Sequence, residues 1–248
     1  MDQKQLYELQ IVGQEKRSNI QKKSINGRDK FIIEYLQNLY NQKQELKIAE
    51  LSIGDGSLSV ALLDSLNKIQ LTGVDISCTR ITEVKKIIED TFIEPQTRVE
   101  FYECNFDTQF NILDPNLFDV VIALDIVEHV FDVFGFVDNC YRILKQEGTL
   151  LIRVPNVAYI KHRVGLLFGN LPITASWFGD QGNLRVWRDR WGWDGGHLHY
   201  FTIPLLYQLL KQSGFQVELC RDPGTQFSSF RDLLPELLYS NPLIIARK

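Results

Sequence analysis

The sequence predicts a doubly wound α/β fold, in which a mostly parallel seven-stranded sheet has helices on both faces. Short segments of continuously apolar residues recur along the chain, and longer segments with apolar residues at helical spacing separate most of them. A parallel sheet covered on both faces needs this alternation, because its strands are buried on both sides and its connections are helical.

The first predicted helix spans residues 28–44. Its apolar residues at helical spacing are Phe31, Ile32, Tyr35, Leu36 and Leu39. We expect this face to pack on the sheet edge or beside the mouth of a ligand site. Further helices are predicted at 57–66, 79–92, 132–144 and 203–213. The last of these has strong boundary signals, because Thr202 can cap it, Pro204 lies in its first turn and Gly214 can end it.

The predicted strands are short apolar segments between these helices. They cover residues 47–53, 69–76, 98–104, 117–127, 148–155, 215–220 and 241–248. The alternation stops after Pro155 and resumes near residue 200. We therefore expect two parts: a polar N-terminal arm at 1–27, and one domain at 28–248 with an insertion at about 156–200.

The insertion is rich in aromatic residues. It contains all four tryptophans, Trp177, Trp187, Trp191 and Trp193, interleaved with arginines. Such a segment can form a lid that stacks on a ring or a sugar, or it can simply give the insertion its own small core. Both interpretations stay open at this point.

Composition argues against several classes of function. A formal net charge of -4 and a pI near 5.6 provide no basic field for phosphate backbones, so we expect no nucleic-acid partner. The four cysteines are widely spaced and form no C-x-x-C pair, so neither a metal site nor a disulfide framework is predicted. No signal peptide or run of apolar residues long enough to span a membrane is visible, and we expect a cytoplasmic protein.

The segment "ELSIGDG", residues 50–56, follows a predicted strand and precedes a helix. Glycines at such a turn let a ligand approach the backbone N–H groups at the helix N-terminus. Asp75 ends the next predicted strand, where a carboxylate can accept both ribose hydroxyls of an adenosine. A dinucleotide-binding loop would have a third glycine where "GDGSLS" has Ser59.

Other segments favour a different adenosine cofactor. "ELSIGDG" resembles the E-x-G-x-G-x-G loop of class I S-adenosylmethionine-dependent methyltransferases, whose fold is Rossmann-like, with Ser52 at the first glycine. "LFDVVIALDIVEHVFD" resembles the strand-four motif of that family, and "CYRILKQEGTLLIRVPN" its strand-five motif. "VPNVAYIKHRVGLLFGN" and "DGGHLHYFTIPLLYQLLKQSGFQV" are similar to the methionine-biosynthesis W-type, or methyltransferase-23-like, subgroup. The resemblance covers roughly residues 30–220.

The resemblance implies a cofactor site for S-adenosylmethionine, with S-adenosylhomocysteine as the product. Glu50 would anchor the loop, and Ser52, Gly54 and Gly56 would pass the methionine part of the cofactor. Asp75 would hold the ribose.

The adenine and the methionine end have further implied contacts. Ile76 would lie beside the adenine. Asn105 aligns with the acid that meets the adenine amino group, followed by Phe106, and Asp107 is the alternative after a small register shift. Leu124 and Asp125 would line the methionine end.

A hydroxyl nucleophile needs a base during methyl transfer, whereas a carboxylate nucleophile does not. The candidates are His129, His197 and His199, of which we favour His197 because a similar histidine occurs in quinone O-methyltransferases. Each could instead be structural. We expect O-methylation of a small-molecule or glycan-like acceptor by a monomer or homodimer. The alternatives are N- or C-methylation of a quinone or natural-product scaffold, and a non-catalytic methyltransferase-like partner protein.

Overall fold

The computed structural model describes residues 4, 26–92, 98–169, 197–224 and 228–248. Within these ranges a seven-stranded sheet has the order β3-β2-β1-β4-β5-β7-β6. The strands are β1 (Leu46–Leu51), β2 (Ile69–Asp75), β3 (Val99–Glu103), β4 (Phe118–Leu124), β5 (Leu144–Arg153), β6 (Gln216–Arg221) and β7 (Leu243–Arg247). The predicted doubly wound α/β fold is confirmed.

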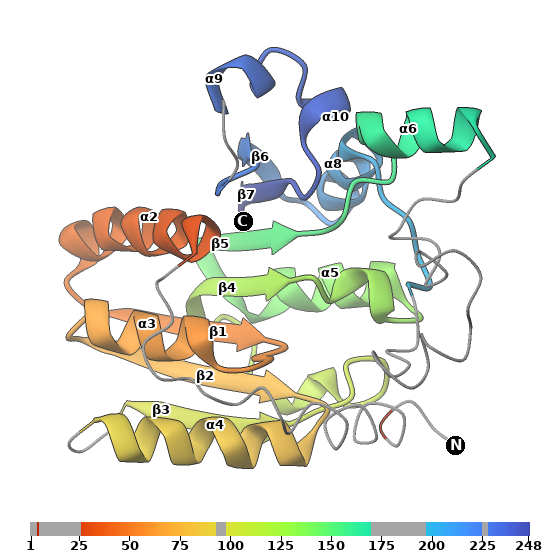
Figure 1. Ribbon diagram of the computed structural model, residues 1–248. Coiled ribbons are helices and arrows are strands. Elements are labelled where there is room, and N and C mark those ends of the chain that lie inside the picture. Colours follow the sequence, from red (N-terminus) through yellow and green to blue (C-terminus); the bar gives the residue numbers. More distant parts are fainter. Residues whose placement is uncertain (1–3, 5–25, 93–97, 170–196, 225–227) are drawn as a thin grey trace.

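Most neighbouring strands run parallel, and β7 is the exception. β1 pairs in parallel with β2 and β4, and β3 and β5 extend the parallel part on either side. β7 inserts antiparallel between β5 and β6. The carboxyl ends of the parallel strands consequently lie along one edge of the sheet, toward which their arrowheads point in Figure 1.

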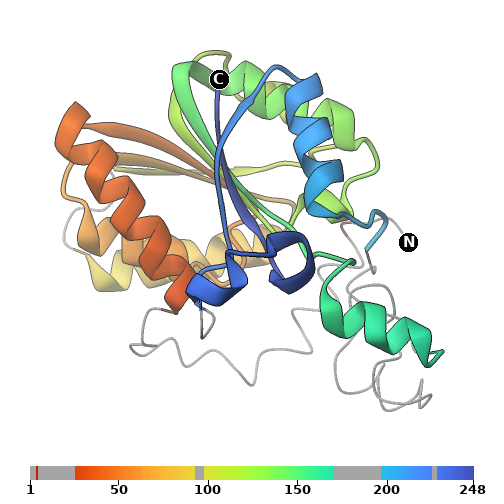
Figure 2. The same ribbon diagram turned by 90° about the horizontal axis from the view of Figure 1, so that it is seen from above.

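Helices cover both faces of the sheet, as Figure 2 shows. α2 (Gly27–Lys43), α3 (Ser57–Ser65) and α4 (Cys78–Thr91) pack on one face, and α5 (Val133–Ile143) and α8 (Ile203–Gln212) pack on the other. Short elements are η2 (Phe110–Ile112), η3 (Val127–His129), α6 (Ile160–Leu167), α9 (Ser228–Arg231) and α10 (Pro235–Leu238). Each face has its own buried apolar cluster, because strands buried on both sides send alternate side chains to opposite faces.

Local chemistry sets the helix starts. The Asn26, Ser77 and Asp132 side chains accept the N–H groups that begin α2, α4 and α5. The predicted cap of α8 is confirmed, since Thr202 Oγ1 accepts from Leu205 N at 3.4 Å. α2 buries Ile32 and Leu36 against the sheet, as its spacing predicts.

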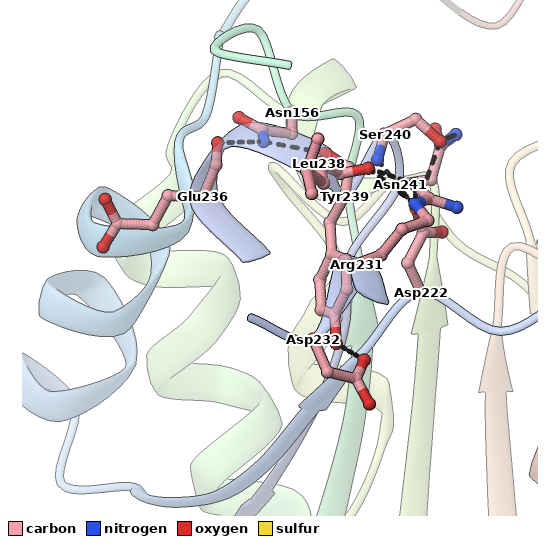
Figure 3. Close-up of polar contacts among 9 residues, drawn as sticks. All are labelled: Asn156, Asp222, Arg231, Asp232, Glu236, Leu238, Tyr239, Ser240 and Asn241. Carbon is pink, nitrogen blue, oxygen red and sulfur yellow. Dashed lines mark hydrogen bonds and ion pairs between the residues drawn. The ribbon is translucent and has the colours of Figure 1, made fainter. Parts of the chain in front are cut away.

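A buried polar network fixes the C-terminal segment, which the sequence resemblance does not cover (Figure 3). Asn156, after β5, donates through Nδ2 to the carbonyls of Glu236 (3.1 Å) and Tyr239 (2.9 Å). Asp222 accepts from Ser240 N at 2.7 Å and pairs with Arg231. These contacts hold α9 and α10 against the end of the sheet and bring β7 into register.

Several sequence predictions fall outside the described residues. They include the four tryptophans and nearly all of the polar N-terminal arm. Of the insertion, the structure describes α6 and the segment from residue 197 onward. In the part of the chain that is described, no helix is both long enough and apolar enough to cross a membrane.

Candidate active site

A cavity of about 250 Å³ lies at the carboxyl ends of β1 and β4. From β1 the chain winds outward through β2 and β3 and then returns to β4 on the other side, so the cavity occupies the point where the strand order reverses. Open α/β sheets bind ligands at this position. The cavity is lined by Arg28, Glu50, Leu51, Ser52, Ile53, Gly54, Asp55, Ser57, Leu58, Ile122, Leu124 and Asp125.

The turn after β1 adopts the conformation that its glycine pattern predicts. Gly54 has φ of +56°, and a Cβ there would meet only Arg80 Nη1, at 3.8 Å. This residue therefore leaves room for a ligand beside the backbone. Ser52 has φ of 67°, in the left-handed region that glycine adopts at little cost and that a side chain makes strained.

Gly56 lies at the same turn but serves a different contact. Its φ is +74°, and an added Cβ would lie 2.7 Å from both Cγ atoms of Val84 on α4. The residue is also the N-cap of α3. The absence of a side chain at Gly56 thus lets α3 and α4 pack closely, and the residue lies outside the described cavity lining.

Glu50 is buried beneath the turn at the end of β1. Its carboxylate accepts a hydrogen bond from the Ser59 hydroxyl on α3, at 2.5 Å. Burial raises the pKa of the Glu50 carboxyl to about 8, and the Ser59 hydrogen bond opposes that rise. A carboxyl group in this position ties strand, turn and helix together, which agrees with the anchoring role that the sequence implies.

Asp75 lies at the tip of β2 and is only 5% exposed. Its Oδ1 accepts from Ser77 N at 3.0 Å, and its Oδ2 accepts a longer bond from Gly54 N at 3.4 Å. Burial raises the pKa of this carboxyl, while the backbone bonds and Arg80 oppose the rise. The carboxylate and the open backbone of Gly54 are therefore brought together, as an adenosine-binding site needs. Ile76, the next residue, follows the same strand end.

The segment after β3 has mainly internal contacts. Asn105 Oδ1 accepts from Asp107 N at 3.0 Å, and Asp107 Oδ1 in turn accepts from Phe131 N at 2.9 Å. The Phe106 ring packs against the Phe110 and Phe136 rings, with centroids 4.8 and 5.4 Å apart. Asp107 thus joins this segment to the loop after η3, and Asn105 and Phe106 lie outside the described cavity lining.

Leu124 ends β4, Asp125 follows it, and both line the cavity. Their place at the methionine end of the cofactor stays a prediction. Asp125 has φ of 53° and forms an ion pair with Arg153 (2.5 Å). A longer contact of 3.6 Å joins it to Arg28 on α2. Burial raises the pKa of the Asp125 carboxyl, and the arginines and His197 oppose the rise.

The sequence predictions do not include Arg28 and Arg153. Arg28 comes from α2 and Arg153 from β5, and neither has a motif around it that signals a ligand contact. Only the packing of α2 beside the cavity brings the Arg28 guanidinium to a place where it can meet a carboxylate.

Two of the three predicted histidines meet near this cavity. The His129 and His197 rings form an edge-to-face pair with centroids 4.8 Å apart. The carbonyl of Glu128 accepts from Leu198 N (2.9 Å) and His199 N (3.2 Å), and these bonds hold the end of the insertion against η3. The third histidine, His199, points its Nε2 to the Phe131 carbonyl at 3.2 Å and so has a structural contact.

Glu128 is a further candidate that the sequence predictions do not name. It is 1% exposed, and in the part of the chain that the structure describes neither carboxylate oxygen has a hydrogen-bond partner. Burial raises the pKa of the carboxyl to about 8, and the nearby Asp125 adds to the rise. The sequence signal for Glu128 is its place in the E-H pair, directly before His129.

The fold has counterparts among solved methyltransferase structures. A Mesorhizobium loti S-adenosylmethionine-dependent methyltransferase has this fold, with a TM-score of 0.58, 18% identity and coverage of 82% of this chain and 91% of that one. A DszA carbon methyltransferase gives a TM-score of 0.63 at 17% identity, over 96% of this chain and 57% of that one. These likenesses show that the chain has the Rossmann-like α/β fold of those solved methyltransferases.

A family model described as a methyltransferase domain matches residues 26–219, and the chain belongs to that family. Its cofactor is accordingly S-adenosylmethionine. The residues present fit this group, because Gly54 leaves open space at the turn and the Asp75 carboxylate lies beside it. At the other end, Arg28 offers a cation for the carboxylate of the methionine part.

Curated relatives match over shorter stretches. The mitochondrial ubiquinone biosynthesis O-methyltransferase of Bos taurus is 32% identical over 73 residues, which are 29% of this chain and 19% of that protein. The ubiquinone biosynthesis O-methyltransferase of Rickettsia prowazekii (strain Madrid E) is 26% identical over 132 residues, 52% of this chain and 48% of that protein. The chain thus spans less than half the length of these relatives.

Proposed function

We propose that this protein transfers a methyl group from S-adenosylmethionine to an oxygen of a small-molecule or glycan-like acceptor. One observation supports the proposal most strongly. Asp125, which lines the cofactor cavity, also lies within electrostatic range of His197 and Glu128. Groups that can accept or donate a proton therefore lie next to the expected position of the methyl group.

The cofactor would be held by residues from β2, from the turn after β1 and from α2, with support from the residue that follows β4. Asp75 would accept the ribose hydroxyls, and Gly54 would let the methionine part pass close to the backbone. Arg28 would meet the methionine carboxylate, and Asp125 would keep the Arg28 and Arg153 guanidinium groups in place. Glu50 would act indirectly, by fixing the turn through Ser59.

The adenine contacts remain with the residues that the sequence implies. Ile76, Asn105 and Phe106 follow the ends of β2 and β3, next to the ribose position. The hydrogen bonds of Asp107 to the loop after η3 favour Asn105 over Asp107 as the adenine contact.

When bound, S-adenosylmethionine supplies a methyl group on a sulfonium, which is already a strong electrophile. The protein must align the acceptor oxygen with that group and exclude water. A hydroxyl acceptor must also lose its proton. His197 and its neighbour His129 are the groups placed to assist, whereas the His199 ring is turned to a backbone carbonyl.

Methylation at oxygen is favoured over nitrogen or carbon by the relatives. The two ubiquinone biosynthesis proteins are named O-methyltransferases, and the similarity covers part of each. The same proposal has four further parts. The protein belongs to the W-type subgroup, residues 28–248 form one domain, the location is cytoplasmic, and the protein is a monomer or a homodimer. N- or C-methylation, or a non-catalytic partner role, would replace it if turnover fails on oxygen acceptors.

Thermal unfolding with S-adenosylmethionine or S-adenosylhomocysteine tests whether the protein binds the cofactor. Ligand at about a hundred times its Kd should stabilise the protein by roughly 2.7 kcal/mol. Asp75→Ala should abolish that shift, whereas His197→Ala should leave it intact and remove turnover on hydroxyl acceptors such as catechols and sugars. A shift with NAD but none with S-adenosylhomocysteine would contradict the proposal, and a normal shift without turnover on any acceptor would indicate the non-catalytic role.

A further inference from the structure

Glu128, His129 and His197 form a compact group of possible metal ligands, which we call the Glu-His-His cluster. One donor atom from each residue lies within 4.8 Å of the other two. The cluster joins η3, which follows β4, to the described residues at the end of the insertion, from residue 197 onward. Two elements that are distant in sequence thus supply one carboxylate and two imidazoles to a single point.

The Glu128 carboxylate is a second, independent observation that points to a ligand at this cluster. The residue is 1% exposed, and both of its carboxylate oxygens lack a hydrogen-bond partner within the described ranges. A buried carboxylate in that state is costly, and buried charges in proteins are normally paired or coordinate a metal. The two arginines near Asp125 pair with Asp125 itself.

The backbone holds the two parts of the cluster in a fixed relation. Leu198 N and His199 N both donate to the Glu128 carbonyl, so His197 enters the cluster from a segment docked on η3. His129 N donates to Ile126 O at 2.9 Å, which fixes the turn that presents Glu128 and His129. Preorganised backbone of this kind is what a metal site needs, because it lowers the cost of bringing ligands together.

We propose that the Glu-His-His cluster binds a divalent metal ion of the zinc type, with Glu128, His129 and His197 as its protein ligands. Two imidazoles and one carboxylate suit zinc, whereas magnesium prefers oxygen ligands only. Ligand atoms around a tetrahedral zinc ion lie about 3.4 Å apart. Side-chain rotations that move each donor atom by about 1 Å would bring the three atoms to that spacing. Three protein ligands leave one position open.

The open position gives the metal a chemical role, which rests on the proposed O-methyltransferase function. An acceptor hydroxyl bound there would have a lowered pKa, as metal-bound water does. Its O–H bond breaks and the proton passes to water. The oxygen electron pair then forms the bond to the methyl carbon, while the carbon–sulfur bond breaks with its electrons on sulfur. His197 would in that case be a metal ligand and not a free base.

Direct zinc binding tests the site without an acceptor. Chelator-treated protein is titrated with Zn²⁺ by calorimetry, and metal content is measured after dialysis. We expect one equivalent to bind, and Glu128→Gln and His197→Ala each to weaken binding at least tenfold. His162→Ala is the matched control. His162 lies on α6 and its ring faces the Asn156 carbonyl, so this substitution should leave zinc affinity unchanged. Mg²⁺ should not compete at equal concentration.

Two outcomes would overturn the site: no zinc binding by the wild-type protein, or equal binding by the wild type, Glu128→Gln and His197→Ala. The shift in unfolding temperature with S-adenosylhomocysteine, measured on each variant, shows that the variant is folded. It also separates the two proposals. Cluster-dependent zinc binding without any such shift would leave the metal site standing and contradict the methyltransferase function.

Discussion

The His129 and His197 rings meet edge to face, with centroids 4.8 Å apart and an interplanar angle of 82°. His129 lies in η3, after β4, and His197 lies at the end of the insertion, so the contact joins two distant parts of the chain. Asp125 lines the cofactor cavity and interacts electrostatically with His197, so the cavity and the histidine pair are neighbours.

Ser52→Gly should stabilise the protein. Ser52 has φ of 67°, and a left-handed conformation costs a residue with a side chain about 1 kcal/mol. Chemical unfolding should show a gain of about that size, reduced by the greater freedom of glycine in the unfolded chain. Calorimetry with S-adenosylhomocysteine on the same protein then reveals what the serine does for the cofactor. A loss of stability would mean that the Ser52 hydroxyl makes a contact worth more than the strain.

Gly54→Ala and Gly56→Ala form a matched pair at one turn. Alanine at Gly56 brings its Cβ within 2.7 Å of the Val84 side chain, so unfolding free energy should fall by about 2 kcal/mol. Alanine at Gly54 meets open space, so it should destabilise less, through φ alone, but weaken cofactor binding more. Val84→Ala should rescue much of the Gly56→Ala loss in a double-mutant cycle. Equal effects of both alanines on cofactor affinity would contradict the division of roles.

Glu50→Gln should change how stability depends on pH. Burial raises the pKa of Glu50 to about 8 in the folded protein, from an ordinary value of 4.5. A carboxyl whose folded pKa is raised contributes its full stability below the unfolded value and loses it as pH rises through the folded value. Wild-type stability should therefore fall between pH 4.5 and 8 relative to the variant. Asp29, Asp55 and Arg28 also act on Glu50 and should be present unchanged in both proteins. Parallel pH profiles would show that Glu50 is ionised in the folded state.

Arg28→Ala should weaken binding of S-adenosylmethionine about tenfold or more, because a charge-assisted contact with the methionine carboxylate would be lost. Binding of 5′-methylthioadenosine, which lacks that carboxylate, should change far less. Lys30→Ala on the same helix is the control, since its ion pair with Glu34 is exposed. An equal loss for both ligands would indicate that Arg28 acts only by keeping Asp125 in place.

The residue pattern predicts the alternation of strands and helices, the turn at "SIGDG" and the acid at Asp75, because each depends on residues close together in the chain. The hydrophobic periods and turn chemistry specify these features locally. The capped start of α8 is another such case.

Which distant groups share the site depends on how the elements pack, and this was visible in the structure alone. It placed β7 antiparallel between β5 and β6, brought Arg28 from α2 into the cavity, and buried Glu128 beside both histidines. It also showed that Gly56 is needed for the approach of α4 and that Ser52 has a glycine conformation. These features arise from how separate elements pack on the sheet, and burial, electrostatic environment and steric contact have no local signal in a single sequence.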